Sequence, residues 1–138
     1  MEEQRKETSC EARIDQHLQG RIDDLKRLWN AFIAGKPDEE LGSINEYALC
    51  FDYVAPGTFD DQTEGYFRYQ ISYGGPSDEF RFFVNPDFTA HCIEYWFLDW
   101  FDGAHRVLKD EPARVVRNLW DWLNAAGMIA SAYKEAQS

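Results

Sequence analysis

Residues 64–84, EGYFRYQISYGGPSDEFRFFV, decide the fold, because apolar and polar side chains alternate through two runs that a turn separates. An alternation of period two is typical of strands that bury one face. The segment between the runs, Gly74-Gly75-Pro76-Ser77, has turn chemistry and is too short to connect parallel strands. The stretch therefore predicts an antiparallel hairpin, whose apolar face carries Phe67, Tyr69, Ile71 and Tyr73 from the first run and Phe80, Phe82 and Val84 from the second.

The same period extends outward from this hairpin in both directions. Residues 47–54 alternate cleanly and residues 92–100 less cleanly, and short segments that contain Pro56-Gly57 and Pro86-Asp87 connect them to the hairpin. The sequence therefore predicts a four-stranded antiparallel meander, with strands at 47–54, 64–73, 79–84 and 92–100.

Helical spacing of apolar residues replaces the strand pattern at both ends. Residues 11–34 carry one apolar stripe and stop at Gly35 and Pro37, and a second stripe begins after Asp110-Glu111-Pro112, with a break expected near Gly127. We therefore expect an α+β fold in two layers, with both helices packed on one face of the sheet. Residues 1–10 form a frayed tail in this prediction, and residues 11–138 form a single domain.

Composition limits the classes of partner. The 138 residues include 14 basic and 25 acidic side chains, a net charge of −11, which opposes direct binding to nucleic acid or to an anionic membrane. No run approaches the length of a membrane span, and the first residues, MEEQRKETSCEAR, lack the apolar segment of a signal peptide. The three widely spaced cysteines are typical of free thiols. We therefore expect a cytoplasmic protein with a basic partner.

The acidic excess is concentrated in the strand region. Between Leu41 and Gly103 there are eleven acidic residues and only two basic ones, so this segment carries −9 of the net −11. The segment also contains 17 of the 22 aromatic residues.

The strand parity gathers a polar and aromatic set on the face away from the helices: Asp52, Tyr66, Arg68, Gln70, Glu79, Arg81, Phe83, Glu94 and Trp96. One interpretation is structural: Arg68 and Arg81 pair across strands with the acids, while the rings cover the arginine stems. The other is functional: Tyr66, Phe83 and Trp96 are partly exposed anchors within an acidic rim that binds a protein. Both remain open at this point.

Six acids of the connecting segments offer a second functional interpretation, in which they imitate the phosphates of a nucleic acid; a solvated acidic surface is the simpler explanation. These are Asp60, Asp61, Asp78, Glu79, Asp99 and Asp102. Together, the two interpretations predict a partner-binding set of Asp52, Asp60, Asp61, Glu64, Tyr66, Asp78, Glu79, Phe83, Glu94 and Trp96.

Catalytic motifs are absent from the sequence, which has no nucleotide-binding loop, zinc-protease motif or nucleophile elbow. One alternative is a small enzyme or ligand-binding protein, in which Asp99 or Asp102 orients His105 as a general base beside Trp100. His91 and Cys92 are too few for a metal site, and Cys50 and Cys92 are expected to be inert in strand interiors. We expect no metal and no cofactor.

Several runs resemble small proteins carried on bacterial plasmids and integrative elements. The resemblance spans about residues 28–106 and is carried by the runs at 45–47, 51–59, 64–70, 74–82 and 93–106. These relatives are uncharacterised accessory proteins, so the resemblance implies no site residues. It implies a context, since small acidic proteins of mobile elements are often directed at host defence or replication.

The leading hypothesis is a non-enzymatic interaction protein of a mobile element that inhibits a nucleic-acid-binding defence complex, of a restriction or CRISPR type. Charge mimicry and steric blocking are both open as its means of action. A homodimer that pairs through its exposed sheet face or sheet edge is a further alternative.

Overall fold

The computed structural model describes residues 9–137, which form a five-stranded antiparallel sheet, three α-helices and one short 3-10 helix. The sheet order follows the sequence order, so the predicted α+β class and the meander are confirmed. The predicted tail lies mostly outside the described residues, and the Ser9 side chain caps the first helix. The elements are α2 (Cys10–Ile33), η1 (Ile44–Glu46), β1 (Cys50–Val54), β2 (Tyr66–Ser72), β3 (Ser77–Val84), β4 (Ala90–Asp99), β5 (Asp102–Val107), α3 (Asp110–Ala125) and α4 (Met128–Gln137).

The prediction of four strands was wrong, because β5 adds a fifth strand at the edge of the sheet. Asp102-Gly103 reads as a turn, yet Asp99 pairs with Asp102 and Gly103 lies opposite Leu98, so the connection is Trp100-Phe101. Trp100 adopts a positive φ of 57° there. A Cβ atom at Gly103 would come within 2.7 Å of the Leu98 side chain. This glycine therefore serves close packing inside a strand pair and not a turn.

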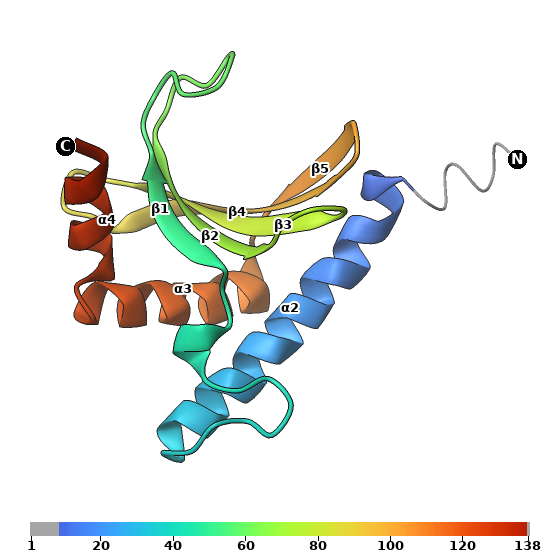
Figure 1. The fold of residues 1–138 in the computed structure, drawn as a ribbon, viewed down its shortest axis with the longest axis vertical. Coiled ribbons are helices and arrows are strands. Elements are labelled where there is room, and N and C mark those ends of the chain that lie inside the picture. The colour runs from blue at the N-terminus through green and yellow to red at the C-terminus, as the bar shows by residue number, and fades with distance from the viewer. Residues whose placement is uncertain (1–8, 138) are drawn as a thin grey trace, which may run out of the picture.

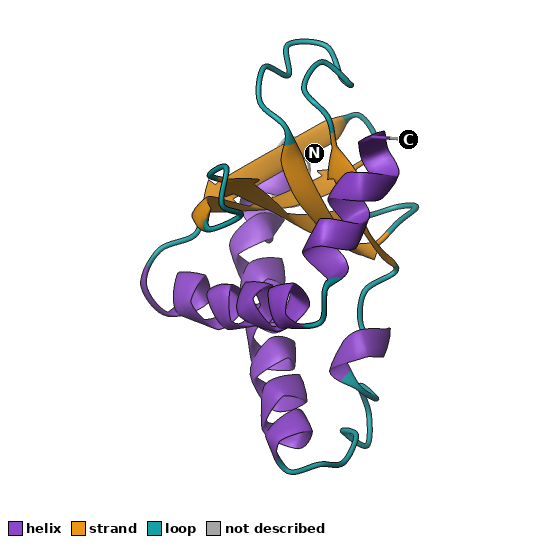
Figure 2. Cartoon of the chain, turned by 90° about the vertical axis from the view of Figure 1, so that its left-hand side faces the viewer, coloured by secondary structure: helices purple, strands orange, loops and turns teal. Residues whose placement is uncertain are grey.

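The helices cover one face of the sheet, as predicted, but they do not form one flat layer. In Figure 1, α3 runs below the sheet, α2 runs diagonally from beside β5 to a point below α3, and α4 stands beside β1. The C-terminal half of α2 therefore packs on α3 instead of on the sheet (Figure 2). The expected break separates α3 from α4 at Gly127, which has a φ of 77°. None of these helices is both long and apolar enough to cross a membrane within residues 9–137.

The core lies between the helices and the sheet face that they cover, which we call the inner face. Phe67, Phe80 and Phe82 are fully buried on this face, and Trp120 of α3 stacks on Phe82 with ring centroids 4.6 Å apart. The helices complete the core with Ile14, Ile22, Leu25, Leu28, Val116, Leu119, Leu123 and Ile129. Burial of these apolar side chains is the dominant stabilising term of the fold.

The opposite face of the sheet, which we call the outer face, carries no helix. The connection between β1 and β2 rises away from the helices on this side, and both views show it (Figures 1 and 2). The β1–β2 connection therefore borders one side of the outer face.

Candidate functional site

The outer face forms a cavity of about 580 Å³, which we call the outer cavity. A volume of this size lies within the range of ligand-binding clefts. Residues of β2, β3 and β4 form its floor, and the β1–β2 connection forms one wall. Its lining residues are Phe59, Asp60, Asp61, Gln62, Thr63, Glu64, Tyr66, Arg68, Gln70, Tyr73, Ser77, Glu79, Arg81, Phe83, Glu94, Trp96 and Leu98.

Both arginines of the outer cavity are paired internally, as the structural interpretation expected. Arg68 forms a bidentate ion pair with Asp52 across β1 and β2, with N–O distances of 3.0 and 2.7 Å. Arg81 Nε donates to Glu79 Oε2 at 2.7 Å, although these two residues belong to the same strand. Glu79 is only 2% exposed, so its charge is enclosed by this pair. The two arginines are therefore neutralised within the sheet.

Aromatic rings enclose the Arg81 guanidinium from two sides. Its central carbon lies 3.9 Å from the centroid of the Trp96 ring and 4.6 Å from that of Tyr66. On its other face, Trp96 stacks on His105 with centroids 4.4 Å apart. Four neighbouring strands thus contribute to one stack across the outer face.

Tyr66 is not a partly exposed anchor, because it is only 2% exposed beneath Arg81. Its hydroxyl has no hydrogen-bond partner among the described residues. Burial is the largest influence on this group and raises the pKa of Tyr66. Phe83 and Trp96 are half-buried, which fits the anchors that the functional interpretation requires.

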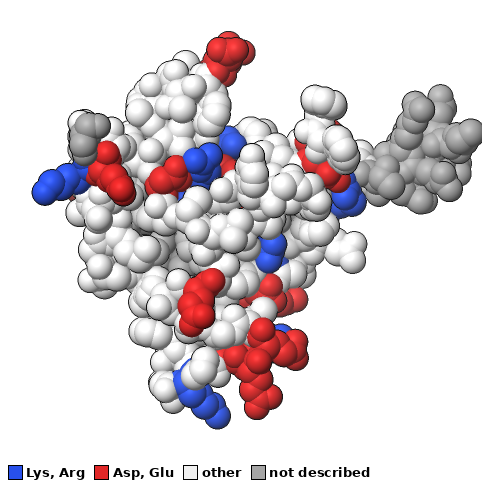
Figure 3. Space-filling view, in the orientation of Figure 1, with Lys and Arg blue, Asp and Glu red and all other residues white. Residues whose placement is uncertain are grey.

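Four carboxylates around the outer cavity form no ion pair with any Lys or Arg that the structure describes: Asp60, Asp61, Glu64 and Glu94. Glu94 accepts a hydrogen bond from Trp96 Nε1 at 2.9 Å, and Glu64 lies 3.4 Å from His91 Nε2. Figure 3 shows acidic side chains at the tip of the β1–β2 connection and charges of both signs next to one another over the sheet. The outer cavity therefore has an unbalanced negative charge.

Asp78 does not belong to this surface, because β3 begins at Ser77 and turns Asp78 to the inner face, where it is 2% exposed. Its carboxylate accepts hydrogen bonds from Arg21, Ser72 and Tyr95, with Arg21 Nε at 2.6 Å. Burial raises the pKa of Asp78, but the three donors outweigh burial and hold it below its ordinary value. The expectation that Asp78 contacts a partner was therefore wrong, since it is part of a buried ion pair.

The proposed alternative site is also bonded to the rest of the fold; it comprises Asp99, Asp102 and His105. Asp99 pairs with Arg13 at 2.7 Å, and Asp102 accepts a hydrogen bond from the backbone N–H of Cys10 at 2.7 Å. Asp102 therefore satisfies a free amide at the N-terminus of α2, and this bond holds its pKa below the ordinary value. His105 instead faces Trp96, and no carboxylate within residues 9–137 hydrogen-bonds to it. The pair that a general base needs is thus not assembled, and Trp100 is 89% exposed beside it.

The thiols are placed differently from the prediction, since Cys50 is exposed and Cys10 is the buried cysteine. Cys92 is half-buried on the outer face, and burial, Glu94 and Glu64, in that order, raise its pKa. The described residues contain no group of three or more His, Cys, Asp or Glu side chains that could hold a metal ion.

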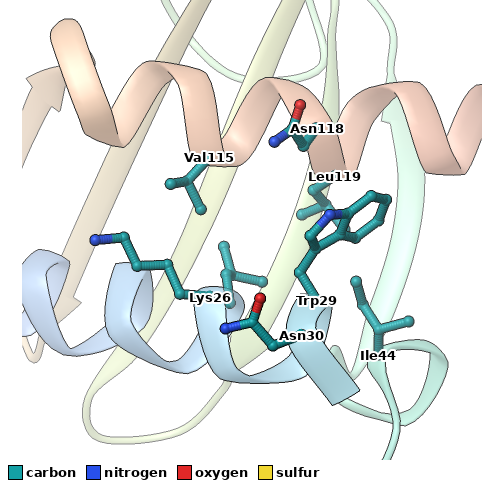
Figure 4. Close-up of a pocket in the computed structure, with 8 residues that line it drawn as sticks. Lys26, Trp29, Asn30, Ile44, Val115, Asn118 and Leu119 are labelled. Atoms are coloured by element: carbon teal, nitrogen blue, oxygen red, sulfur yellow. The ribbon is translucent and has the colours of Figure 1, made fainter. Parts of the chain in front are cut away.

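A second cavity of about 260 Å³ lies between α2, α3 and η1 (Figure 4). Trp29 of α2 reaches toward Leu119 of α3 and closes one side of it, and Ile44 lies nearby. Lys26 is its only ionisable lining residue, and this amine is paired with Glu111 at 2.6 Å. The cavity is smaller than a typical ligand site and its other polar lining residues, Asn30 and Asn118, are uncharged, so it is typical of imperfect helix packing.

Sequence reasoning missed two aromatic residues of the outer cavity. Phe59 is half exposed in the β1–β2 connection. The prediction that Tyr73 shares the apolar face of Phe67 was wrong, because the register shifts between Gln70 and Ser72, β2 ends there, and Tyr73 is 79% exposed in the lining of the outer cavity. The position of Phe59, between turn residues and Asp60-Asp61, is the sequence signal that could have identified it. Comparisons with protein-family models, curated proteins and solved structures find no match to this chain.

Proposed function

We propose that this protein is a non-enzymatic interaction module that binds a basic protein surface in the outer cavity. One observation carries this proposal: four carboxylates that pair with no Lys or Arg of residues 9–137 surround a concave floor that contains half-buried aromatic rings. Aromatic anchors within a charged rim are typical of protein-binding sites. The resemblance to proteins of mobile elements directs the proposal to nucleic-acid-binding complexes of host defence, since these have basic surfaces.

Steric blocking is better supported than charge mimicry as the means of inhibition. Of the six acids in the proposed phosphate-like run, Asp78, Glu79, Asp99 and Asp102 are all bonded within the fold. Asp60 and Asp61 alone do not imitate a regular row of phosphates. A module that occupies the basic surface of its partner excludes nucleic acid without such a row.

Self-association through the outer cavity is electrostatically unfavourable. A two-fold dimer would place the four unpaired carboxylates of one copy against the same four of the other. With a net charge of −11, we therefore expect a monomer of 16.1 kDa in sedimentation at low salt.

A photo-crosslinking experiment tests the proposal. A photoreactive amino acid replaces Tyr73 at the rim of the outer cavity, and a matched variant carries it at Asp121, an exposed residue on α3. We expect the Tyr73 variant to crosslink a basic protein of a bacterial lysate, and the purified partner to release its bound DNA as this protein is added.

Charge variants distinguish binding at the outer cavity from a general electrostatic attraction of a basic protein to this acidic one. Replacement of both Glu64 and Glu94 by Gln is expected to abolish the crosslink, whereas Asp121→Asn with Glu39→Gln, which removes the same total charge elsewhere, is expected to preserve it. Equal crosslinking from positions 73 and 121 would reject the outer cavity as the binding site. A captured partner that retains its DNA would reject the inhibitory role alone.

A further inference from the structure

The outer cavity already contains one complete guanidinium site, which its own Arg81 occupies. Two rings, those of Tyr66 and Trp96, sandwich the guanidinium, and the buried Glu79 accepts a hydrogen bond from its Nε–H. Planar stacking together with a carboxylate is the arrangement that suits arginine and not lysine. The surface of this sheet is therefore built from the groups that recognise a guanidinium.

The same kinds of group, carboxylates and an aromatic ring, also line the outer cavity where no Lys or Arg of residues 9–137 pairs with them. Glu64 and Glu94 both line the outer cavity, and the only basic group of the described residues within ion-pairing distance of either is the imidazole of His91, 3.4 Å from Glu64. Phe83, which is paired with Cys92 across β3 and β4, also lines the outer cavity, so the same surface offers an aromatic ring. A cation that entered here would meet two carboxylates and the face or edge of a ring.

The Tyr66 hydroxyl is a second, independent sign of an absent partner. Tyr66 lines the outer cavity and its ring packs near Phe83, with centroids 5.7 Å apart. Its oxygen is buried without any hydrogen bond to the described residues. Buried hydroxyls are almost always satisfied, so one that is not requires an explanation, and a bound donor would supply it.

We infer that the outer cavity binds the guanidinium of an arginine side chain, which a basic segment of the partner protein supplies. This inference rests on the proposed function and names the chemistry that the partner must present. A guanidinium has five donors for Glu64, Glu94 and the Tyr66 oxygen, and its weakly hydrated plane can stack on a ring. A lysine ammonium would gain the charge interaction but not the stacking.

Anionic ligands fit the outer cavity less well. Its two cationic groups, Arg68 and Arg81, are already held by Asp52 and Glu79, so an anion would have to break an existing pair. The unpaired carboxylates at the rim would also repel it.

The test is a titration of the whole protein, observed by the NMR shifts of its backbone amides, with three acetylated and amidated tripeptides. Gly-Arg-Gly is the probe, Gly-Lys-Gly has the same charge, and Gly-citrulline-Gly has nearly the same shape without charge. We expect the arginine peptide to bind in the millimolar range and to shift the amides of Glu64, Tyr66, Phe83 and Glu94. The lysine peptide should bind about fivefold more weakly, and the citrulline peptide should not bind.

Two pairs of matched variants locate the contact. Replacement of both Glu64 and Glu94 by Gln should abolish binding, while Asp121→Asn with Glu39→Gln should leave it unchanged. Tyr66→Phe should weaken binding, whereas Tyr69→Phe should not, although the Tyr69 hydroxyl is equally buried and unpartnered on the inner face.

Equal affinity for the arginine and lysine peptides would overturn the inference, as would shifts located outside the outer cavity. If position 73 still crosslinked a basic protein alongside either result, only the arginine site would be rejected and the proposed function would stand. A cavity that binds the arginine peptide and captures no basic protein would instead reject the proposed function and retain the arginine site.

Discussion

The two faces of the sheet differ in how completely their charged side chains are paired. On the inner face, the single buried carboxylate of Asp78 is satisfied by three donors from α2, β2 and β4. On the outer face, two ion pairs satisfy Arg68 and Arg81, and four further carboxylates pair with no Lys or Arg within the described chain. Balanced charge is what a stable core requires, since an unpaired buried charge is costly. The unbalanced charge therefore marks the outer face as the one that is available for binding.

The largest expected effect comes from replacing, one at a time, two neighbouring aromatic residues whose rings point to opposite faces of the sheet. Phe82→Ala should lower the free energy of unfolding by about 3–5 kcal/mol, because it leaves a cavity beneath Trp120 in the core. Phe83→Ala on the outer face should cost about 1 kcal/mol. Urea denaturation of both variants measures the difference. Similar losses would mean that the outer face is also part of the core.

The next effect concerns the buried ion pair. Asp78→Asn should cost about 3 kcal/mol at pH 7, because it leaves the Arg21 guanidinium without its carboxylate. The folded pKa of Asp78 is lowered, so its contribution is full above the unfolded pKa of about 3.9 and is lost as the pH falls through the folded pKa. The gap between the wild-type and variant unfolding curves should therefore narrow below about pH 4. A gap that is constant from pH 7 to pH 3 would contradict the pairing.

Removal of the two hydroxyls that have no hydrogen-bond partner should have a smaller effect, and should raise the free energy of unfolding instead of lowering it. Tyr66→Phe and Tyr69→Phe should each raise the free energy of unfolding by about 1 kcal/mol, since each removes a buried polar atom without a hydrogen bond. Thermal or urea unfolding measures both, and arginine peptide binding separates them. A loss of stability in Tyr66→Phe would show that its hydroxyl has a partner in the free protein.

The smallest effect is expected at the β4–β5 connection. Trp100 and Phe101 are almost fully exposed, so Trp100→Ser should change the free energy of unfolding by less than about 0.5 kcal/mol. It should also leave binding of the arginine peptide unchanged, because Trp100 does not line the outer cavity. A marked loss of binding would extend the site to this connection.

Strand parity predicted the composition of the outer face because side chains alternate strictly along a strand. Arg68, Arg81 and Trp96 therefore lie where the alternation placed them, although Tyr66 is covered by Arg81. The pairing of Asp78 with Arg21 could not be predicted, because the two residues are 57 positions apart and no local pattern connects them.

The fifth strand was missed for a local reason. Its sequence, DGAHRV, contains no alternation of apolar residues, and Gly103 imitates a turn. The same error left Asp99 and Asp102 on an exposed turn in the prediction, whereas the added strand brings them to the N-terminal end of α2.

The contact between α2 and β5 has a consequence for synthesis of the chain. The hydrogen bond from Cys10 to Asp102 joins residues 92 positions apart, and Arg106 reaches back to Glu11 and Asp15. At 5–20 residues per second, a ribosome needs about 5–20 seconds to make the intervening chain. Strands β1 to β4 can pair in that time as local hairpins. Although it is made before the sheet, α2 is therefore among the last elements to dock, and its apolar stripe is exposed to chaperones until β5 emerges.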